Sequence, residues 1–131
     1  MIRKGTMKVS LIALVALLFA TANVWAEYDK AEVVQVMRQN VSKLNEAKTA
    51  AAKGDFYTAA AAFFEIAKGM NGIKPFNPYK GEQANWDKTI DAVVTAAFRG
   101  IGASAEKDLA GVNKQIAELQ ALNKAGHSAH K

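Results

Sequence analysis

The chain has two histidines, His127 and His130, and both lie within its last five residues. Imidazole is a common ligand of iron, copper and zinc, so this end of the chain is a candidate cofactor or metal site. The sequence contains no cysteine, which excludes thiolate metal sites, iron–sulfur clusters and cysteine nucleophiles. It also lacks a Glu-x-x-His motif, and no Ser-His-Asp arrangement with a base on a rigid element can be proposed. We therefore expect a binding protein rather than an enzyme.

His127 follows a segment with an apolar stripe whose members are three or four residues apart: Leu109, Val112, Ile116, Leu119 and Leu122. At 100° per residue, His127 lies about 20° round from Ile116, so it points near the buried side of the same helix. Beyond Leu119 the stripe changes to Asn123 and Gly126, which are not bulky apolar residues. This change predicts space for something other than side chains close to His127.

Three more helices are expected before this one, because the region is rich in Ala, Lys, Glu and Gln and shows no period-two alternation. We expect them over about 28–52, 56–70 and 85–103, with Ser104 as the N-cap of the last helix. Gly54 ends the first helix and Asp55 caps the second, and a connection rich in Pro and Gly separates the second from the third. The sequence thus predicts an all-α domain, an antiparallel up-down-up-down four-helix bundle.

The apolar stripes of the first three helices predict the core. The first stripe comprises Val33, Met37, Val41, Leu44 and Ala51; the second comprises Phe56, Ala59, Ala60, Phe63, Phe64, Ala67 and Met70; the third comprises Trp86, Ile90, Val93, Val94, Ala97, Phe98 and Ile101. Phe63 and Phe64 are adjacent, which indicates deep burial of their helix. The larger aromatic residues could line a pocket, although aromatic residues at helical spacing are more often plain core.

Residues 1–26 have the features of a secretory signal peptide, cleaved to leave a mature domain over 27–131. Arg3, Lys4 and Lys8 precede or begin an apolar run that is too short for a membrane span of about 20 residues. Removal of these three bases leaves 14 of the 17 basic residues and all 12 acidic residues, so the net charge falls from +5 to +2. We therefore expect a periplasmic protein that binds neither nucleic acid nor, after cleavage, membrane.

Met37 is the residue expected to lie across the bundle from His127. In an antiparallel bundle the first helix begins at the end where the last helix finishes. Met37 is roughly 13 Å along its helix, and His127 is about one turn before the chain end. A thioether and an imidazole that face each other are the axial ligands of low-spin haem iron in electron-transfer cytochromes.

The chain resembles the cytochrome c′ family of periplasmic four-helix haem proteins over nearly all of 27–131. The likeness is carried by MRQN at 37–40, by FNPYKGEQANWDKTID at 76–91, and by His127 with Lys131 four residues on. The family's Cys-x-x-Cys-His haem-attachment motif falls on Asn123-Lys124-Ala125-Gly126-His127, which keeps the histidine and lacks both cysteines. Covalent attachment of haem through two thioether bonds is therefore excluded, whereas non-covalent haem is not.

The soluble b-type four-helix cytochromes share this architecture and hold haem by a Met of the first helix and a His near the end of the last. Met37 and His127 match both positions. The likeness implies non-covalent haem b, with His127 as proximal and Met37 as distal ligand, and one-electron transfer with a redox partner protein. Asn123 and Gly126 then lie where a planar cofactor approaches the backbone, and Phe63 and Trp86 are candidates to line its pocket. Without Met37 as a ligand, five-coordinate iron implies binding of a diatomic gas such as nitric oxide.

Two alternatives stay open from the sequence. The loss of both cysteines is compatible with a haem-free relative that keeps the bundle as a binding or structural module. His127 and His130, about one turn apart, are compatible with a periplasmic copper or zinc site completed by Met37 or a carboxylate. Asp87 and Asp91 on the third helix are expected to be a solvated face. Because the first helix of the c′ family often builds a dimer interface, the resemblance also implies a homodimer through that helix.

Overall fold

The computed structural model describes residues 30–76 and 82–130, and beyond Gly126 it describes the course of the backbone alone. These ranges contain four α-helices and no strand: α2 (Lys30–Ala52), α3 (Phe56–Ile73), α4 (Gln83–Ala105) and α5 (Leu109–His130). The prediction of an all-helical domain with four helices is confirmed. The predicted signal peptide lies outside the described residues. Of the helices that the structure describes, none is long and apolar enough to cross a bilayer.

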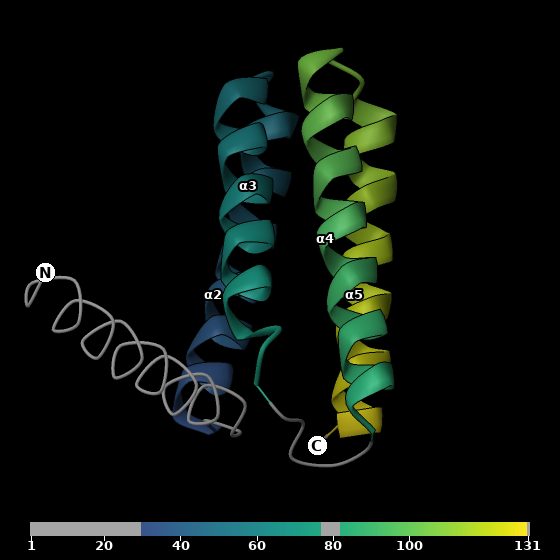
Figure 1. The fold of residues 1–131 in the computed structure, drawn as a ribbon. Coiled ribbons are helices and arrows are strands. Elements are labelled where there is room, and N and C mark those ends of the chain that lie inside the picture. The colour runs from purple at the N-terminus through teal and green to yellow at the C-terminus, as the bar shows by residue number, and fades with distance from the viewer. Residues whose placement is uncertain (1–29, 77–81, 131) are drawn as a thin grey trace, which may run out of the picture.

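The four helices lie side by side in a bundle (Figure 1). Three interfaces follow the chain order, α2 with α3, α3 with α4 and α4 with α5, and all three are extensive. α2 also meets α5, and this interface is much sparser than the other three. The short links α2–α3 and α4–α5 lie at one end of the bundle in Figure 1, and the first residues of α2 and the last of α5 lie at the other. We call this second end the histidine end, because the backbone of His127 and His130 belongs to it.

The turn between α2 and α3 has the two features that the sequence predicts. Gly54 adopts a φ of +80°, a left-handed conformation that glycine tolerates because it has no Cβ. Asp55 is the N-cap of α3, and its carboxylate accepts hydrogen bonds from the Thr58 hydroxyl at 2.6 Å and the Thr58 backbone N–H at 3.1 Å. The hydroxyl and the N–H, in that order, lower the pKa of Asp55, because both bonds favour the charged carboxyl.

The break between α4 and α5 differs from the prediction. Ser104 does not cap the last helix: it is a buried residue of α4, and its hydroxyl donates to the backbone carbonyl of Gly100 at 2.8 Å. Asp108 takes the capping role instead, since its Oδ1 accepts a hydrogen bond from the Gly111 N–H at 3.0 Å. A serine within a helix can satisfy its hydroxyl on the carbonyl four residues earlier, and this competes with the capping role.

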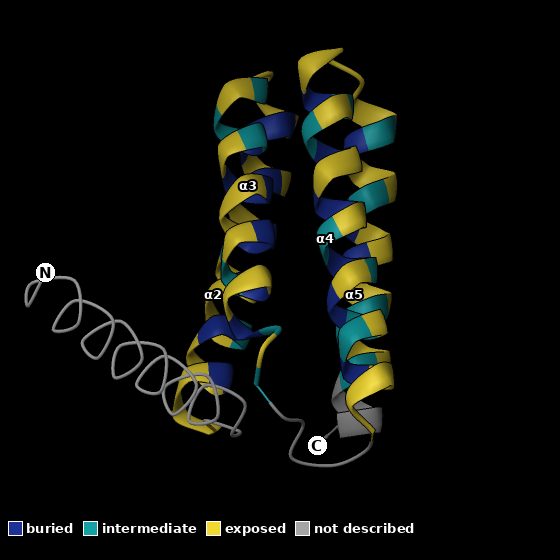
Figure 2. Ribbon diagram, in the orientation of Figure 1, coloured by how far each residue is buried: buried dark blue, intermediate teal, exposed yellow. Residues whose placement is uncertain are grey.

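The buried residues form one continuous core on the inward faces of the helices (Figure 2). Many of its members are small, and Ala47, Ala59 and Ala97 have no exposed surface. Four residues predicted to be in the core are partly exposed instead: Val41 at 50%, Phe64 at 52%, Phe98 at 54% and Leu109 at 42%. The alanines let the helices approach closely, so neighbouring large side chains are displaced to the outer edges of the interfaces.

Candidate functional site

Met37 lies at one edge of the inward face of α2, about 100° round the helix from Val36. The α3 side is marked by Val36, whose Cγ1 lies 3.4 Å from the position that a Cβ would take on Gly69. One residue advances a helix by about 100°, so Met37 lies beyond the buried Asn40 and Leu44 at the opposite edge of the inward face. Met37 is half-buried and packs against the core. Because α5 is the next helix that α2 contacts after α3, we expect this edge to adjoin the sparse α2–α5 interface.

His127 and His130 belong to α5, which runs to His130. Their side chains lie outside the described residues, so the distance between Met37 and His127 stays a prediction. Asn40 of α2 and Asn123 of α5 lie at a similar height along the bundle, because both line one cavity. Met37 precedes Asn40 by three residues and His127 follows Asn123 by four. The start of α2 and the close of α5 are at the same end of the bundle (Figure 1), so both steps lead one turn toward the histidine end.

A cavity among all four helices has a volume of ≈10 Å³, and its wall is formed by Asn40, Leu44, Ile66, Met70, Val93, Leu119 and Asn123. Asn40 is only 7% exposed, and its Nδ2 donates a hydrogen bond to the Sδ of Met70 at 3.1 Å. The sequence interpretation missed Asn40 because it followed apolar residues alone. Its spacing could have indicated that Asn40 faces the core, since it is three residues after Met37 and four before Leu44.

The two methionines near this cavity differ in what their sulfur atoms do. Met70 is 2% exposed, and its Sδ already accepts the hydrogen bond from Asn40. Met37 is half-buried at the edge of the core. A half-buried thioether at a sparse interface is the better placed of the two to meet an incoming ligand, because it loses fewer packing contacts when the interface opens.

Gly126 has a packing role that the sequence did not reveal. A Cβ at this position would lie 2.9 Å from the Cγ2 of Thr89 on α4, which is closer than side chains normally approach. The glycine therefore allows α5 to lie close against α4 near the histidine end. Asn123 is half-buried and lines the cavity. Of the two residues predicted to leave room beside His127, Gly126 faces α4 and Asn123 lines the small cavity.

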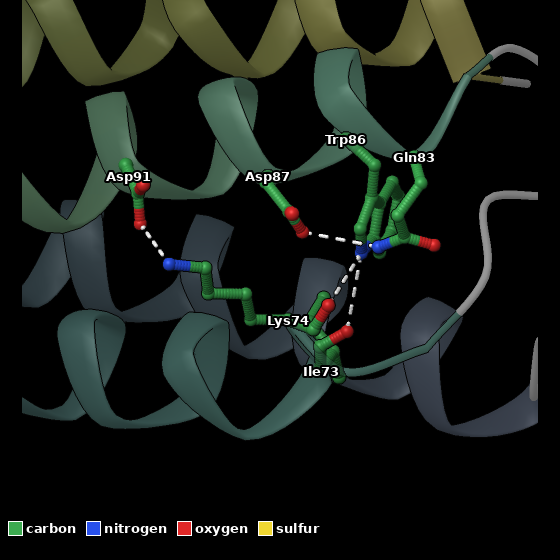
Figure 3. Close-up of polar contacts among 6 residues, drawn as sticks. All are labelled: Ile73, Lys74, Gln83, Trp86, Asp87 and Asp91. Carbon is green, nitrogen blue, oxygen red and sulfur yellow. Dashed lines mark hydrogen bonds and ion pairs between the residues drawn. The ribbon is translucent and has the colours of Figure 1, made fainter. Parts of the chain in front are cut away.

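Phe63 and Trp86 are both buried, but the structure does not bring them together. The ring of Phe63 lies over Gly100 of α4, and a Cβ on that glycine would be 2.6 Å from the ring. Trp86 is at the other end of the α3–α4 interface, where its indole Nε1 donates to the carbonyls of Ile73 at 3.3 Å and Lys74 at 3.2 Å (Figure 3). Ten residues of helix, or roughly 15 Å, separate Phe63 from Ile73. Each aromatic residue thus stabilises its own part of the α3–α4 interface.

The carboxylates of α4 beside Trp86 are engaged with neighbouring side chains (Figure 3). The Oδ1 of Asp87 accepts from Gln83 Nε2 at 3.0 Å, and the Oδ1 of Asp91 accepts from Lys74 Nζ at 2.8 Å. The bond to Asp91 raises the pKa of Lys74. Both carboxylates are on the outer surface, as predicted. Across the described part of the chain, no group of three or more His, Asp and Glu side chains could hold a metal ion.

No protein-family model, curated protein or solved structure matches this chain. The chemical content of the site therefore comes from its own residues. It consists of a half-buried thioether on α2, a helical position occupied by histidine on α5 at the same end, and, one turn away, a small and mainly apolar cavity with Asn40 and Asn123 in its wall. The exposure of Val34 at 36% and Val41 at 50% gives α2 an outer apolar edge, and a homodimer through this helix stays a prediction.

Proposed function

We propose that this chain is an exported haem b protein, an antiparallel four-helix bundle that binds the porphyrin between α2 and α5 at the histidine end. His127 is the proximal ligand and Met37 the distal one. Bound iron supplies one-electron transfer between its ferric and ferrous states. The observation that supports the proposal is that Met37, packed against the core, is one turn from Asn40, while His127 follows Asn123 by one turn of α5, and Asn40 and Asn123 line the same cavity.

The donor set fits haem iron. A thioether with an imidazole is a ligand pair of cytochromes that transfer electrons. The sulfur of Met70 is bonded to Asn40, which leaves Met37 as the methionine at the edge of the interface. The cavity of ≈10 Å³ is far smaller than the several hundred Å³ of a cofactor pocket. A porphyrin pocket must therefore extend from this cavity toward His127, and α2 and α5 must separate there to admit it.

The residues of the chain have distinct roles in this proposal. His127 and Met37 bind the iron from the two helices, and the apolar residues next to Met37 exclude water from the distal side. Exclusion of water lowers the local dielectric constant and so shifts the potential of a bound metal. If His127 and Met37 both held the iron, no position would be left for a substrate, and the chemistry that the haem would supply is one-electron transfer to a redox partner protein.

Hemin titration tests the proposal directly. We expect the purified mature chain to take up one equivalent of hemin with a sharp Soret band, and the reduced form to show the narrow α and β bands of six-coordinate low-spin iron. Absence of a Soret band at saturating hemin contradicts the proposal. If the band appears but is that of high-spin iron, Met37 is not a ligand, and binding of a diatomic gas replaces electron transfer as the function.

Two matched pairs of variants assign the ligands. His127→Ala should abolish the low-spin spectrum, whereas His130→Ala, three residues further on, should leave it unchanged. Met37→Leu should convert the iron from low spin to high spin, whereas Met70→Leu should keep the low-spin spectrum, because its sulfur is bonded to Asn40. Equal effects of the two methionine variants, or of the two histidine variants, remove the corresponding ligand from the proposal.

A haem-free bundle is the second candidate, and Gly126 favours it. A Cβ at Gly126 would lie 2.9 Å from Cγ2 of Thr89, so close packing of α5 on α4 explains this glycine without any cofactor. The core positions of Phe63 and Trp86 are explained in the same way. In that case hemin leaves the thermal stability unchanged, whereas a specific ligand of the native state raises Tm in proportion to its concentration and affinity.

A further inference from the structure

The cavity among the four helices is mainly apolar, and its two polar lining residues, Asn40 and Asn123, come from α2 and α5. Its volume of ≈10 Å³ is about the room that one water molecule needs. Asn40 contributes a carboxamide from α2 and Asn123 one from α5, and Asn40 is 93% buried, since only 7% of it is exposed. The rest of the wall is apolar apart from the thioether of Met70.

A carboxamide offers two N–H donors and a carbonyl acceptor. The bond from Asn40 Nδ2 to Met70 Sδ, 3.1 Å long, uses one of the donors, and the carbonyl oxygen and the second donor can serve another partner. A buried water molecule is stable where a small cavity gives it two to four polar partners. We propose that Asn40 and Asn123 bind one internal water molecule, which links α2 to α5 through hydrogen bonds.

This hydrated link has a consequence for the motion of the bundle. The α2–α5 interface is the sparsest of the four, and here water and two amides occupy positions that apolar side chains fill elsewhere. Separating the helices exposes groups that bulk water solvates at once, so opening costs less here than at an apolar interface. The interface is therefore the first to open, and it is the route by which haem reaches the histidine end. This last step rests on the proposed function.

Detection of the water tests the site itself. In the purified chain, NMR cross-peaks from a long-lived water molecule should appear at the Nδ2 protons of both Asn40 and Asn123. A high-resolution crystal structure should place one water within hydrogen-bond distance of the two side chains. A dry cavity overturns the proposal, and so does a direct hydrogen bond between the two carboxamides.

Replacement of one carboxamide tests the consequence. Asn123→Leu continues the stripe of Leu119 into the cavity, and the half-buried position gives the larger side chain room toward the surface. The water signal should vanish, Tm should rise by about 4 to 8 °C, and backbone amides of α2 near Asn40 should exchange at least tenfold more slowly. Asn113→Leu, exposed on the same helix, is the control and should do none of these.

The same test can be made from α2. Asn40→Leu should slow exchange in α5 around Leu119, with Asn45→Leu, exposed on α2, as its control. This pair keeps the inference testable if Asn123→Leu does not fold. Exchange rates that are equal in each variant and its control show that the hydrated link does not govern opening.

Hemin uptake separates the entry route from the proposed function. Asn40→Leu should take up hemin at least fivefold more slowly than Asn45→Leu. Equal association rates overturn the entry route and leave haem binding intact. If the wild-type chain takes up no hemin, the proposed function fails, and the water and hydrogen-exchange results still decide the site.

Discussion

The α3–α4 and α2–α5 interfaces close the same bundle in different ways. Along α3–α4, the ring of Phe63 lies directly on the backbone of Gly100, and the indole of Trp86 donates to the last carbonyls of α3. Along α2–α5, contacts are fewer, and the residues that these two helices contribute to the shared cavity include the amides Asn40 and Asn123. The first interface has large apolar contacts at close range, and the second has fewer contacts and two polar side chains beside the cavity.

The well-packed α3–α4 interface is suited to stabilising the fold, whereas the sparser α2–α5 interface is the candidate place for a ligand. An interface in which a ring contacts a glycine backbone has one well-packed arrangement, because any change of volume is felt at once. A sparse interface can exchange its contacts for water or for a ligand at lower cost. The proposed haem ligands, Met37 and His127, belong to the two helices of this interface. Because α2 also packs extensively on α3, and α5 on α4, we expect the α2–α5 interface alone to open, with the other three kept.

Phe63 should be the most sensitive position of the scaffold. It has no exposed surface, so Phe63→Ala should reduce the free energy of unfolding by about 3 to 5 kcal/mol, through lost burial and the cavity that remains. Phe64→Ala is the control: this neighbour is 52% exposed, and its loss should cost less than about 1 kcal/mol. Urea denaturation measures both. Equal costs at the two positions would mean that α3 is not oriented on α4 as described.

Gly100 tests how close the two helices are. The Cβ of Gly100→Ala would lie 2.6 Å from Cε1 of Phe63, so the substitution should destabilise the fold by about 1 to 3 kcal/mol through overpacking. Gly102→Ala on the same helix meets no atom within 4 Å. It should stabilise the fold by about 0.5 to 1 kcal/mol, because alanine favours helix. Opposite signs in thermal denaturation support the close approach, and stabilisation in both variants contradicts it.

Trp86 tests the polar part of the same interface. Trp86→Phe keeps most of the ring but removes the Nε1–H that serves the carbonyls of Ile73 and Lys74. The two acceptors are at the C-terminus of α3, where backbone carbonyls lack helical partners. We expect a loss of about 1 to 2 kcal/mol, together with faster hydrogen exchange in the last turn of α3. A loss that spreads evenly over all four helices would show that the indole contributes by packing rather than by capping.

The sequence predicted the elements well where local chemistry decides the structure. Gly54 and Asp55 end one helix and begin the next as expected, because a left-handed glycine and an N-cap carboxylate act within a few residues. The prediction that Ser104 caps the last helix was wrong for a related reason. A serine hydroxyl can also bond to the carbonyl four residues earlier, and the nearby Asp108 is a strong cap. Sequence alone does not rank these two outcomes.

The sequence predicted the core less well, because burial depends on how close the helices come. Phe63 and Phe64 differ by about 100° round the helix, and only Phe63 fits where Gly100 lets α4 approach. Phe98 and Val41 are exposed although their spacing fits the predicted stripes. In the candidate site, Met37 and Asn123 were predicted from helical spacing, and Asn123 lines the cavity. Asn40 was missed because its burial depends on its hydrogen bond to Met70 and on the cavity beside it. Both features arise only in the tertiary structure.

The smallest expected effect belongs to the ion pair on the outside of α3–α4. Lys74 Nζ and Asp91 Oδ1 are 2.8 Å apart, with 38% and 60% of the side chains exposed, so Asp91→Asn should lower Tm by about 2 °C or less. The bond raises the pKa of Lys74, so its contribution is present below the ordinary lysine range, about pH 10.4, and is lost as pH rises through the higher folded value. The difference between wild type and variant should also disappear in 1 M salt. A difference that persists at high salt or above pH 12 would mean that charge, as well as Phe63 and Trp86, holds these two helices together.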